Sequence, residues 1–301
     1  MYDLIIIGGG VSGFSGAMYA GRFGMKTLVF TGPLKGGMIT WAKEVCNYPG
    51  FKSISGLELA QKIEAHAKDY DIEIKNGIID KIEKTNEGFK VFNKKEKYEA
   101  KTILYAAGTE VRKLNIDNEE SLKNNGVHYC ALCDGAFYKD KVVAVIGGSD
   151  SATIEALILS DIAKKVYIIY RRGQLRAEKI NQEALEKKEN IEILYNTNVI
   201  GLVGQKKLEK VLLDKEFNDS KELFVDGVFV SIGHIPNSGL VKPLSVELNE
   251  KGFIATDKDS CTNVEGFFAA GDITDRSFKQ AVTGVAEAVV AVYNAYKFCK
   301  H

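Results

Sequence analysis

The strongest pattern along the chain is an apolar run that ends in clustered glycines and is followed by apolar residues at helical spacing. It occurs twice. The first copy runs from Asp3–Ile7 into Gly8–Gly13 and the helical FSGAMYAGRFG, and the second runs from Lys141–Ile146 into Gly147–Ala152 and TIEALILSDIA. A continuous apolar run is typical of a buried parallel strand, and glycines at the turn into a helix permit the bend and the close backbone approach that a dinucleotide needs. The pattern therefore predicts an α/β protein with two dinucleotide-binding units.

The segments around these two units carry weaker patterns. Gly56–Tyr70 places apolar residues on one helical face, and Ile78–Glu99 reads as a small antiparallel meander that leads into a separate strand at Thr102–Tyr105. A helix is expected at Ala177–Glu189, followed by short strands, and a long apolar-periodic helix from about Lys279 to Lys297 ends the chain. The second half thus reads as a smaller copy of the first.

Composition limits the classes of function. The 301 residues, 45% of them hydrophobic and 27% charged, predict two soluble globular domains. Lysine plus arginine and aspartate plus glutamate number 40 each, so no charge excess points to nucleic acid or to an anionic membrane. No run approaches the roughly twenty apolar residues of a membrane span, and Asp3 stands where a signal peptide is positively charged. We expect a cytoplasmic protein that binds neither membrane nor nucleic acid.

The first glycine cluster fits the dinucleotide turn. Gly8 would allow the bend, Gly10 would let phosphate approach the backbone, and Gly13 would pack the helix on the strand. The acidic residue expected about twenty positions later is absent, and Thr31 stands near that place. A glycine turn without a ligand is the alternative interpretation.

The second unit differs in two ways. Arg171 and Arg172 follow its second strand, with Arg176 one helical turn later, and guanidinium groups suit a 2′-phosphate through paired hydrogen bonds. This favours NADPH over NADH, whereas a solvated basic loop is the alternative. Ser149 replaces the second glycine of the motif, where a side chain would crowd the pyrophosphate.

Cys130 and Cys133 form a Cys-x-x-Cys pair followed by Asp134. One thiolate of such a pair attacks a partner disulfide and the other resolves the mixed disulfide, and an adjacent carboxyl group can act as acid or base. Zinc is the main rival, but the sequence offers no second motif to complete four ligands, so we expect no metal. The other cysteines, Cys46, Cys261 and Cys299, are expected to be packing residues, and the four histidines to be surface or core residues without a catalytic role.

These residues together resemble the low-molecular-weight thioredoxin reductases, the bacterial and archaeal type of FAD- and NADPH-dependent pyridine nucleotide-disulfide oxidoreductase. The resemblance covers essentially the whole chain and follows the family's order: GGGVSG, GGMIT with NYPG, CALCDG, GGSDSA, YRRGQLRAE, GHIPN, and FAAGDIT with KQAVTG. Any one of these motifs arises by chance, whereas seven in sequence do not.

The resemblance implies two Rossmann-like domains, with an NADPH domain at 113–236 inserted in an FAD domain built from 1–112 and 237–301. The residues that it implies for FAD are Gly8, Gly10, Ser12, Gly13, Thr31, Gly37, Met38, Asn47, Gly108, Gly271, Asp272, Lys279, Gln280 and Ala281. Those that it implies for NADPH are Gly147, Gly148, Ser149, Asp150, Ser151, Arg171, Arg172 and Arg176.

The resemblance also implies the chemistry. Cys133 would face the flavin, Cys130 would attack oxidised thioredoxin or a glutaredoxin-like protein, and Asp134 would protonate the leaving thiolate. A homodimer is implied in the same way. Met38, Cys46 and Lys279 depart from the family's usual Gln, Glu and Arg. With Ser149 they leave open a related flavin disulfide reductase that takes electrons from ferredoxin or a deazaflavin.

Other classes fit the sequence less well. A ferredoxin:NADP reductase of related fold needs no Cys-x-x-Cys pair, and a peroxiredoxin-reducing flavoprotein usually carries an extra N-terminal thioredoxin-like domain, for which a flavin motif at Gly8 leaves no room. A nucleotide-binding redox sensor or docking module is the alternative without catalysis. It would lack bound FAD and disulfide reductase turnover.

Overall fold

The computed structural model describes residues 1–42, 45, 47–94 and 96–300, apart from the side chains of Leu132 and Cys133. Cys46, expected to be a packing cysteine, lies outside the described residues. The chain divides into two compact units, Met1–Glu110 with Ile235–His301, and Val111–His234. These limits lie two residues from the predicted domain boundaries. The strands β7 (Thr109–Val111) and β16 (His234–Pro236) carry the chain between the units and pair with each other.

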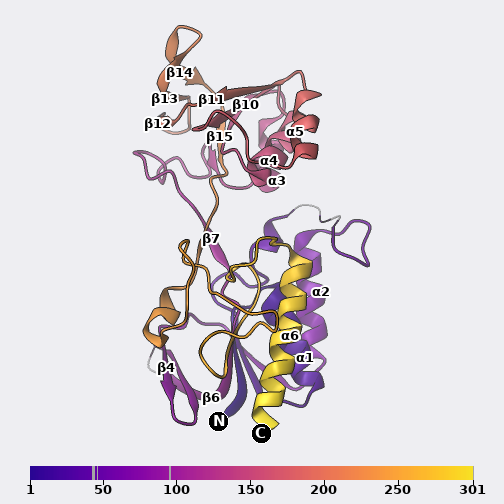
Figure 1. Ribbon diagram of the computed structural model, residues 1–301. Helices are drawn as coiled ribbons and strands as arrows, with labels where there is room; N and C mark the ends of the chain where they lie inside the picture. Colours follow the sequence, from indigo (N-terminus) through magenta and orange to yellow (C-terminus); the bar gives the residue numbers. More distant parts are fainter. Residues whose placement is uncertain (43–44, 46, 95, 301) are drawn as a thin grey trace. The chain divides into compact units, whose positions relative to one another are not determined.

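The first unit is built on one mixed sheet (Figure 1). Its order is β3 (Ile72–Lys75), β2 (Thr27–Phe30), β1 (Tyr2–Ile7), β6 (Glu96–Tyr105), β5 (Gly88–Asn93) and β4 (Lys81–Thr85), with β17 (Phe267–Ala269) also pairing with β6. The strands β3, β2, β1, β6 and β17 run parallel to one another. β4 pairs antiparallel with β5, and β5 pairs antiparallel with β6.

Both faces of this sheet are covered. The helices α1 (Val11–Arg22), α2 (Gly56–Lys68) and α6 (Ala281–Lys300) run side by side, as Figure 1 shows. Leu4 and Ile6 of β1 pack with residues of α1 and α6, while Ile5 and Ile7 pack into a second core with β5 and β17. Because side chains alternate along a strand, burial on both faces requires the continuous apolar run seen in the sequence.

One element differs from the expectation. The strands expected at Lys97–Glu99 and Thr102–Tyr105 form a single ten-residue strand, β6. Ala100 and Lys101 between them have no turn chemistry, so the chain continues straight. The polar half of β6 pairs with β5, and the apolar half lies buried between β1 and β17.

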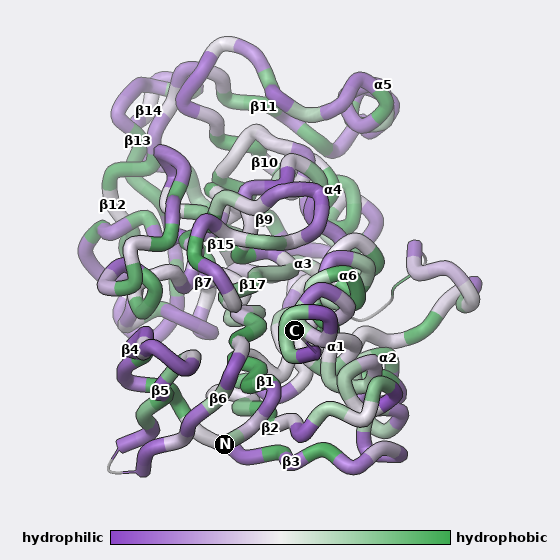
Figure 2. Tube along the Cα trace, turned by 60° about the horizontal axis from the view of Figure 1, so that its bottom comes forward, coloured by the Kyte–Doolittle hydropathy of each residue, from purple (hydrophilic) through white to green (hydrophobic). Residues whose placement is uncertain are grey.

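The second unit has a five-stranded parallel sheet. Its order is β11 (Ile191–Tyr195), β10 (Lys165–Tyr170), β9 (Val142–Ile146), β15 (Gly227–Val230) and β8 (Val127–His128). The helices are α3 (Ala131–Asp134), α4 (Asp150–Ser160) and α5 (Lys179–Glu186), and a small antiparallel sheet holds β12 (Val199–Val203), β13 (Lys210–Phe217) and β14 (Ser220–Phe224). In Figure 2, α5 mixes hydrophilic and hydrophobic positions, because it buries Leu185 and exposes most of its other residues.

The predicted α/β class with two dinucleotide-binding folds is confirmed. No helix within the described residues is long and apolar enough to cross a membrane.

Candidate functional site

The glycine turn after β1 is held by contacts that admit no side chain. Gly8 has a φ of +121°, and a Cβ there would lie 2.1 Å from the carbonyl oxygen of Ala106. A Cβ at Gly13 would lie 1.8 Å from the carbonyl oxygen of Gly8. Gly10 is different, because its nearest neighbour would be Cα of Gly37 at 3.7 Å, an ordinary contact. Space therefore remains at Gly10 for a phosphate to approach the backbone, as the motif requires.

Other predicted residues surround this turn. Ser12 is buried, with its Oγ near both Gly271 and Gly284, where added Cβ atoms would lie within 2.6 and 2.5 Å of it. A Cβ at Gly108 would meet nothing within 4 Å. Gly10 also bridges to Gly36, which brings the GGMIT segment to the same edge of the sheet.

Met38 and Asn47 are each tied to distant parts of the first unit. The Thr109 hydroxyl donates to Sδ of Met38 over 3.7 Å, and the Asn47 amide donates to Oε1 of Gln280 over 3.0 Å. Thr31 is buried, and its hydroxyl lies 3.4 Å from Oδ1 of Asn76. Most of the residues predicted for FAD therefore gather around the carboxyl ends of β1, β6 and β17.

Lys279 and Glu287 hold the turn that carries Gly271 and Asp272. The Lys279 ammonium donates to the carbonyl oxygens of Asp272, over 3.0 Å, and Thr274. From α6, Oε2 of Glu287 accepts the backbone N–H of Gly271 over 2.9 Å. Burial lowers the pKa of Lys279 and raises that of Glu287. Lys279, predicted among the flavin residues, thus uses its charge on the backbone of the turn, directly before Gln280 and the first residue of α6, Ala281.

The second unit repeats the glycine turn. Gly147 has a φ of +150°, and a Cβ there would lie 2.1 Å from the carbonyl oxygen of Ser231. A Cβ at Gly148 would lie 2.5 Å from the ring of Tyr170. Ser149 precedes α4 without making a side-chain capping bond, so its hydroxyl is not committed to the helix end. The turn has the geometry of the first one, with a hydroxymethyl group where the first has a hydrogen.

The arginines stand at the end of β10. Arg171 and Arg172 are exposed directly after it. Arg176 contacts the glycine turn, because its backbone N–H donates to the Gly148 carbonyl oxygen over 2.7 Å. Nε of Arg176 donates to the Tyr170 hydroxyl over 3.1 Å. Three arginines thus follow the end of one strand, and the guanidinium group of Arg176 contacts the last residue of that strand, Tyr170.

Of the remaining predicted residues, Asp150 uses its carboxylate in hydrogen bonds within the protein, and Ser151 is exposed. Oδ1 of Asp150 accepts from the Glu178 backbone over 2.7 Å and from the Asn181 amide over 2.8 Å. Asp150 therefore holds the start of α5.

The cysteine motif lies between β8 and the short 3-10 helix η2 (Gly135–Tyr138) of the same unit. Cys130 is disulfide-bonded, and its carbonyl oxygen accepts the N–H of Asp134 over 3.1 Å, which closes the turn of α3. The side chain of Cys133 lies outside the described part of the chain. Within that part, no three His, Cys, Asp or Glu side chains gather as a metal ion requires.

Two residues near this motif were not identified from the sequence. His128, expected to have no catalytic role, places Nδ1 2.9 Å from Oδ2 of Asp134. Glu155 of α4 accepts hydrogen bonds from the Ala131 N–H and the Ser231 hydroxyl, and its Oε2 is buried without a partner. Burial raises the pKa of Glu155 to about 8. The signal for Glu155 was present, because it is the only charged residue in ATIEALILS.

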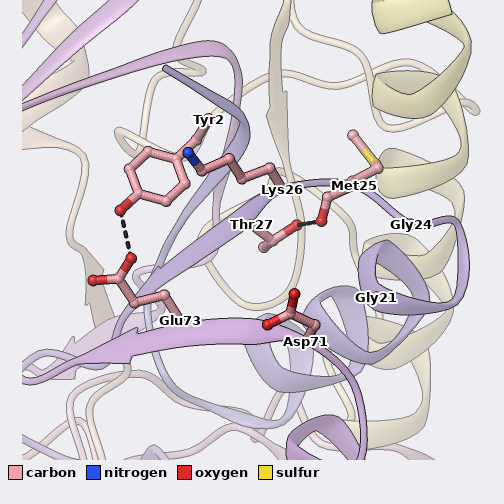
Figure 3. A pocket seen from close by; sticks show the side chains of 8 residues that line it. All are labelled: Tyr2, Gly21, Gly24, Met25, Lys26, Thr27, Asp71 and Glu73. Carbon is pink, nitrogen blue, oxygen red and sulfur yellow. Dashed lines mark hydrogen bonds between the residues drawn. The ribbon is translucent and has the colours of Figure 1, made fainter.

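A cavity elsewhere is not part of this site. It has a volume of about 300 Å³ and is lined by Tyr2, Gly21, Gly24, Met25, Lys26, Thr27, Asp71 and Glu73 (Figure 3). Tyr2 and Thr27 begin β1 and β2, so the cavity lies at the amino ends of the strands, whereas the glycine turns lie at their carboxyl ends. Ligands of open α/β sheets bind at the carboxyl ends.

Comparisons with known proteins agree with this arrangement. A family model described as pyridine nucleotide-disulphide oxidoreductase matches residues 2–288. A thioredoxin reductase of Listeria innocua is 38% identical over 99% of this chain and 94% of its own length. The crystal structure of Lactococcus lactis thioredoxin reductase is 35% identical and covers 100% of this chain and 99% of its own, with a TM-score of 0.90. A ferredoxin-flavin thioredoxin reductase of Clostridium acetobutylicum is 32% identical, covers 98% and 97%, and has a TM-score of 0.54.

The buried carboxyl of Glu155 generates a prediction about stability. Its pKa is raised to about 8 in the folded protein from an ordinary value of 4.5, so the unfolded chain loses this proton first as the pH rises. The stability it contributes is fully present below pH 4.5 and is lost as the pH rises through 8. The side chain of Glu155→Gln stays neutral. The free energy of unfolding of this variant should therefore rise relative to that of the wild type by up to about 1.4 kcal/mol for each pH unit in this range.

Urea unfolding at several pH values between 5 and 8 measures this difference. Glu186→Gln, at an exposed position of α5, is the control and should give no such trend. If the free energies of unfolding of Glu155→Gln and wild type changed with pH in parallel, the carboxyl group would ionise normally.

Proposed function

The chain belongs to the pyridine nucleotide-disulphide oxidoreductase family, among its low-molecular-weight thioredoxin reductases, and we propose that it carries electrons from NADPH through FAD to a Cys130–Cys133 pair and on to oxidised thioredoxin or a glutaredoxin-like protein. One observation carries the proposal. A disulfide-bonded cysteine of a Cys-x-x-Cys motif lies in the same unit as the second glycine turn, while the first unit holds another such turn.

The first unit fits FAD. Gly10 leaves room for the pyrophosphate, and Gly37, Ser12 and Gly108 lie around the same edge of the sheet. Asp272, whose turn is fixed by Lys279 and Glu287, is proposed to hold the ribityl chain. When bound, FAD accepts a hydride and passes electron pairs to a disulfide. The protein's part is to bind and orient it.

The second unit fits NADPH. The backbone at Gly147 and Gly148 would take the pyrophosphate, and Arg171, Arg172 and Arg176 would take the 2′-phosphate through charge-assisted hydrogen bonds. A second donor, ferredoxin or a deazaflavin, is kept as the alternative because Ser149 narrows the approach to the turn. Against it stand the three arginines, for which such a donor gives no reason.

Cys130 is proposed to attack the partner disulfide, Cys133 to exchange electrons with the flavin, and Asp134 to protonate the leaving thiolate. Action in the cytoplasm, as a homodimer, is part of the proposal. A reducing compartment is supported by Cys261 and Cys299, which are both free thiols.

Anaerobic titration of the purified yellow protein with NADPH tests the donor. Prompt loss of the oxidised-flavin absorbance is expected. Arg171→Ala with Arg172→Ala should raise KM for NADPH tenfold or more and change KM for NADH by less than about twofold, since each charged hydrogen bond contributes roughly 1.5–3 kcal/mol. Arg22→Ala, in the first unit, is the control. Bleaching by dithionite but not by NADPH would refute NADPH as donor, and equal effects on both nucleotides would refute the role of the arginines.

The cysteine roles are tested by substitution. Cys130→Ser and Cys133→Ser should each lower thioredoxin reduction by about a thousandfold or more, because exchange needs both sulfurs, while NADPH still bleaches the flavin. Cys261→Ser and Cys299→Ser should stay within about twofold of wild type. Retention of thioredoxin reduction in either of the first two variants would contradict the proposed relay.

The glycine turn of the first unit separates folding from binding. Gly13→Ala should destabilise the apoprotein by more than about 2 kcal/mol, because its Cβ would overlap a carbonyl oxygen. Gly10→Ala should change the apoprotein stability by less than about 0.5 kcal/mol and weaken FAD binding about tenfold or more. Urea unfolding and fluorescence titration with FAD measure the two effects. Unchanged FAD affinity in Gly10→Ala would place the pyrophosphate elsewhere.

A further inference from the structure

His128 is a buried histidine in a closed aromatic and polar environment. Its side chain is 4% exposed and lies at the end of β8, two residues before Cys130. The ring stacks on Phe229 with centroids 5.3 Å apart, and the edge of Tyr138 approaches at the same distance. A ring held on two sides in this way has one orientation.

The two ring nitrogens have different partners. Nε2 lies 2.7 Å from the Tyr138 hydroxyl, a hydrogen bond, and Nδ1 lies 2.9 Å from Oδ2 of Asp134, at ion-pair distance but without hydrogen-bond alignment. Burial, with the charges of Asp134 and Asp226, raises the pKa of Tyr138 to about 12, so its hydroxyl keeps its proton at neutral pH. A phenol that donates to Nε2 leaves the imidazole proton on Nδ1, the nitrogen that lies 2.9 Å from Oδ2 of Asp134.

We infer that His128 is a positioning residue for Asp134: its Nδ1–H holds that carboxyl group in place at the end of α3, and Tyr138 fixes the tautomer that makes this possible. The inference rests on the proposed function, in which Asp134 supplies the proton of the exchange reaction. In this arrangement His128 orients the acid, Asp134, and Tyr138 orients His128, as in other sites where a second side chain orients an acid or base and is itself oriented by a third.

The exchange step shows what the contact does. The Cys130 thiolate attacks one sulfur of the oxidised partner, a Cys130–sulfur bond forms, the partner's disulfide bond breaks, and the leaving sulfur takes the electron pair. The Asp134 carboxyl gives that sulfur a proton and becomes a carboxylate. His128 Nδ1–H then faces a full negative charge, so the contact strengthens as the proton leaves.

The other charged groups nearby act through different contacts. Asp226 accepts the N–H of Val142, Lys141 lies 5.4 Å from the Tyr138 ring, and Glu155 holds the Ala131 N–H at the start of α3. Phe229 presents an apolar ring from β15. Nδ1 of His128, on β8, lies within ion-pair distance of the Asp134 carboxylate on α3.

Two amide variants distinguish the roles of the two ring nitrogens of His128. His128→Asn keeps an amide nitrogen near the position of Nδ1, and His128→Gln keeps one near the position of Nε2. The probes are thioredoxin of Bacillus subtilis, whose leaving alkyl thiol is a strong base, and dithiobis(nitrobenzoate), whose aromatic thiolate is a weak base that departs unprotonated. Dithionite-reduced holoenzyme is mixed with each disulfide in a single turnover, so the result is independent of the nucleotide donor.

His128→Gln should react with thioredoxin about tenfold more slowly than wild type and with the aromatic disulfide within about twofold, since only the first reaction needs the acid. His128→Asn should stay within about threefold on both. Tyr138→Phe, which keeps the ring, should show a smaller loss on thioredoxin alone, and it carries the test if the histidine variants do not fold. Equal losses on both disulfides, or no loss on either, would overturn the inference.

The wild type distinguishes a failure of the proposed function. If it reduces the aromatic disulfide but not thioredoxin, the proposed acceptor is wrong, and hydroxyethyl disulfide, which also releases an alkyl thiol, replaces it in the same comparison. If reduced wild type reacts with no disulfide, both the proposed function and the role of His128 are refuted.

Discussion

Both units depend on the same steric constraint at the end of the strand that leads into the glycine turn, β1 in one unit and β9 in the other. A Cβ at Gly8 would lie 2.1 Å from the carbonyl oxygen of Ala106, and a Cβ at Gly147 would lie 2.1 Å from that of Ser231. Ala106 follows β6 and Ser231 follows β15, and these strands are the parallel neighbours of β1 and β9, respectively. Only glycine lets the chain leave the sheet this close to the next strand. The helix that follows, and with it the ligand site at its start, is positioned by this contact.

The same constraint explains what could be predicted from the sequence. The strand, glycine turn and helix of each unit depend on local rules, so both were identified, and the unit limits lie two residues from the expected domain boundaries. The continuous β6 was missed because its two halves have different exposure patterns, although no turn separates them. The contacts of Lys279, His128 and Glu155 could not be read from spacing, because their partners come from separate segments.

The short helix α3 is stabilised from outside. Four residues provide too few internal hydrogen bonds for a stable helix, so tertiary contacts must hold it. Glu155 binds the N–H of Ala131 at its start, and His128 faces Asp134 at its end. Burial raises the pKa of Glu155 to about 8, so the start of this segment is held by a carboxyl group whose protonation the surrounding fold controls. In the proposed exchange, this carboxyl group lies beside a motif that takes up and releases protons as its disulfide opens and closes.

The two glycine turns also differ at the second and third positions of the motif. In the first turn the third glycine is required, since a Cβ at Gly13 would lie 1.8 Å from the Gly8 carbonyl oxygen. In the second turn Ala152 takes that place and is fully buried, so this helix lies far enough from its turn to accept a methyl group. Ser149 makes no capping bond to α4, and its side chain stands where the first turn has only the hydrogen of Gly10.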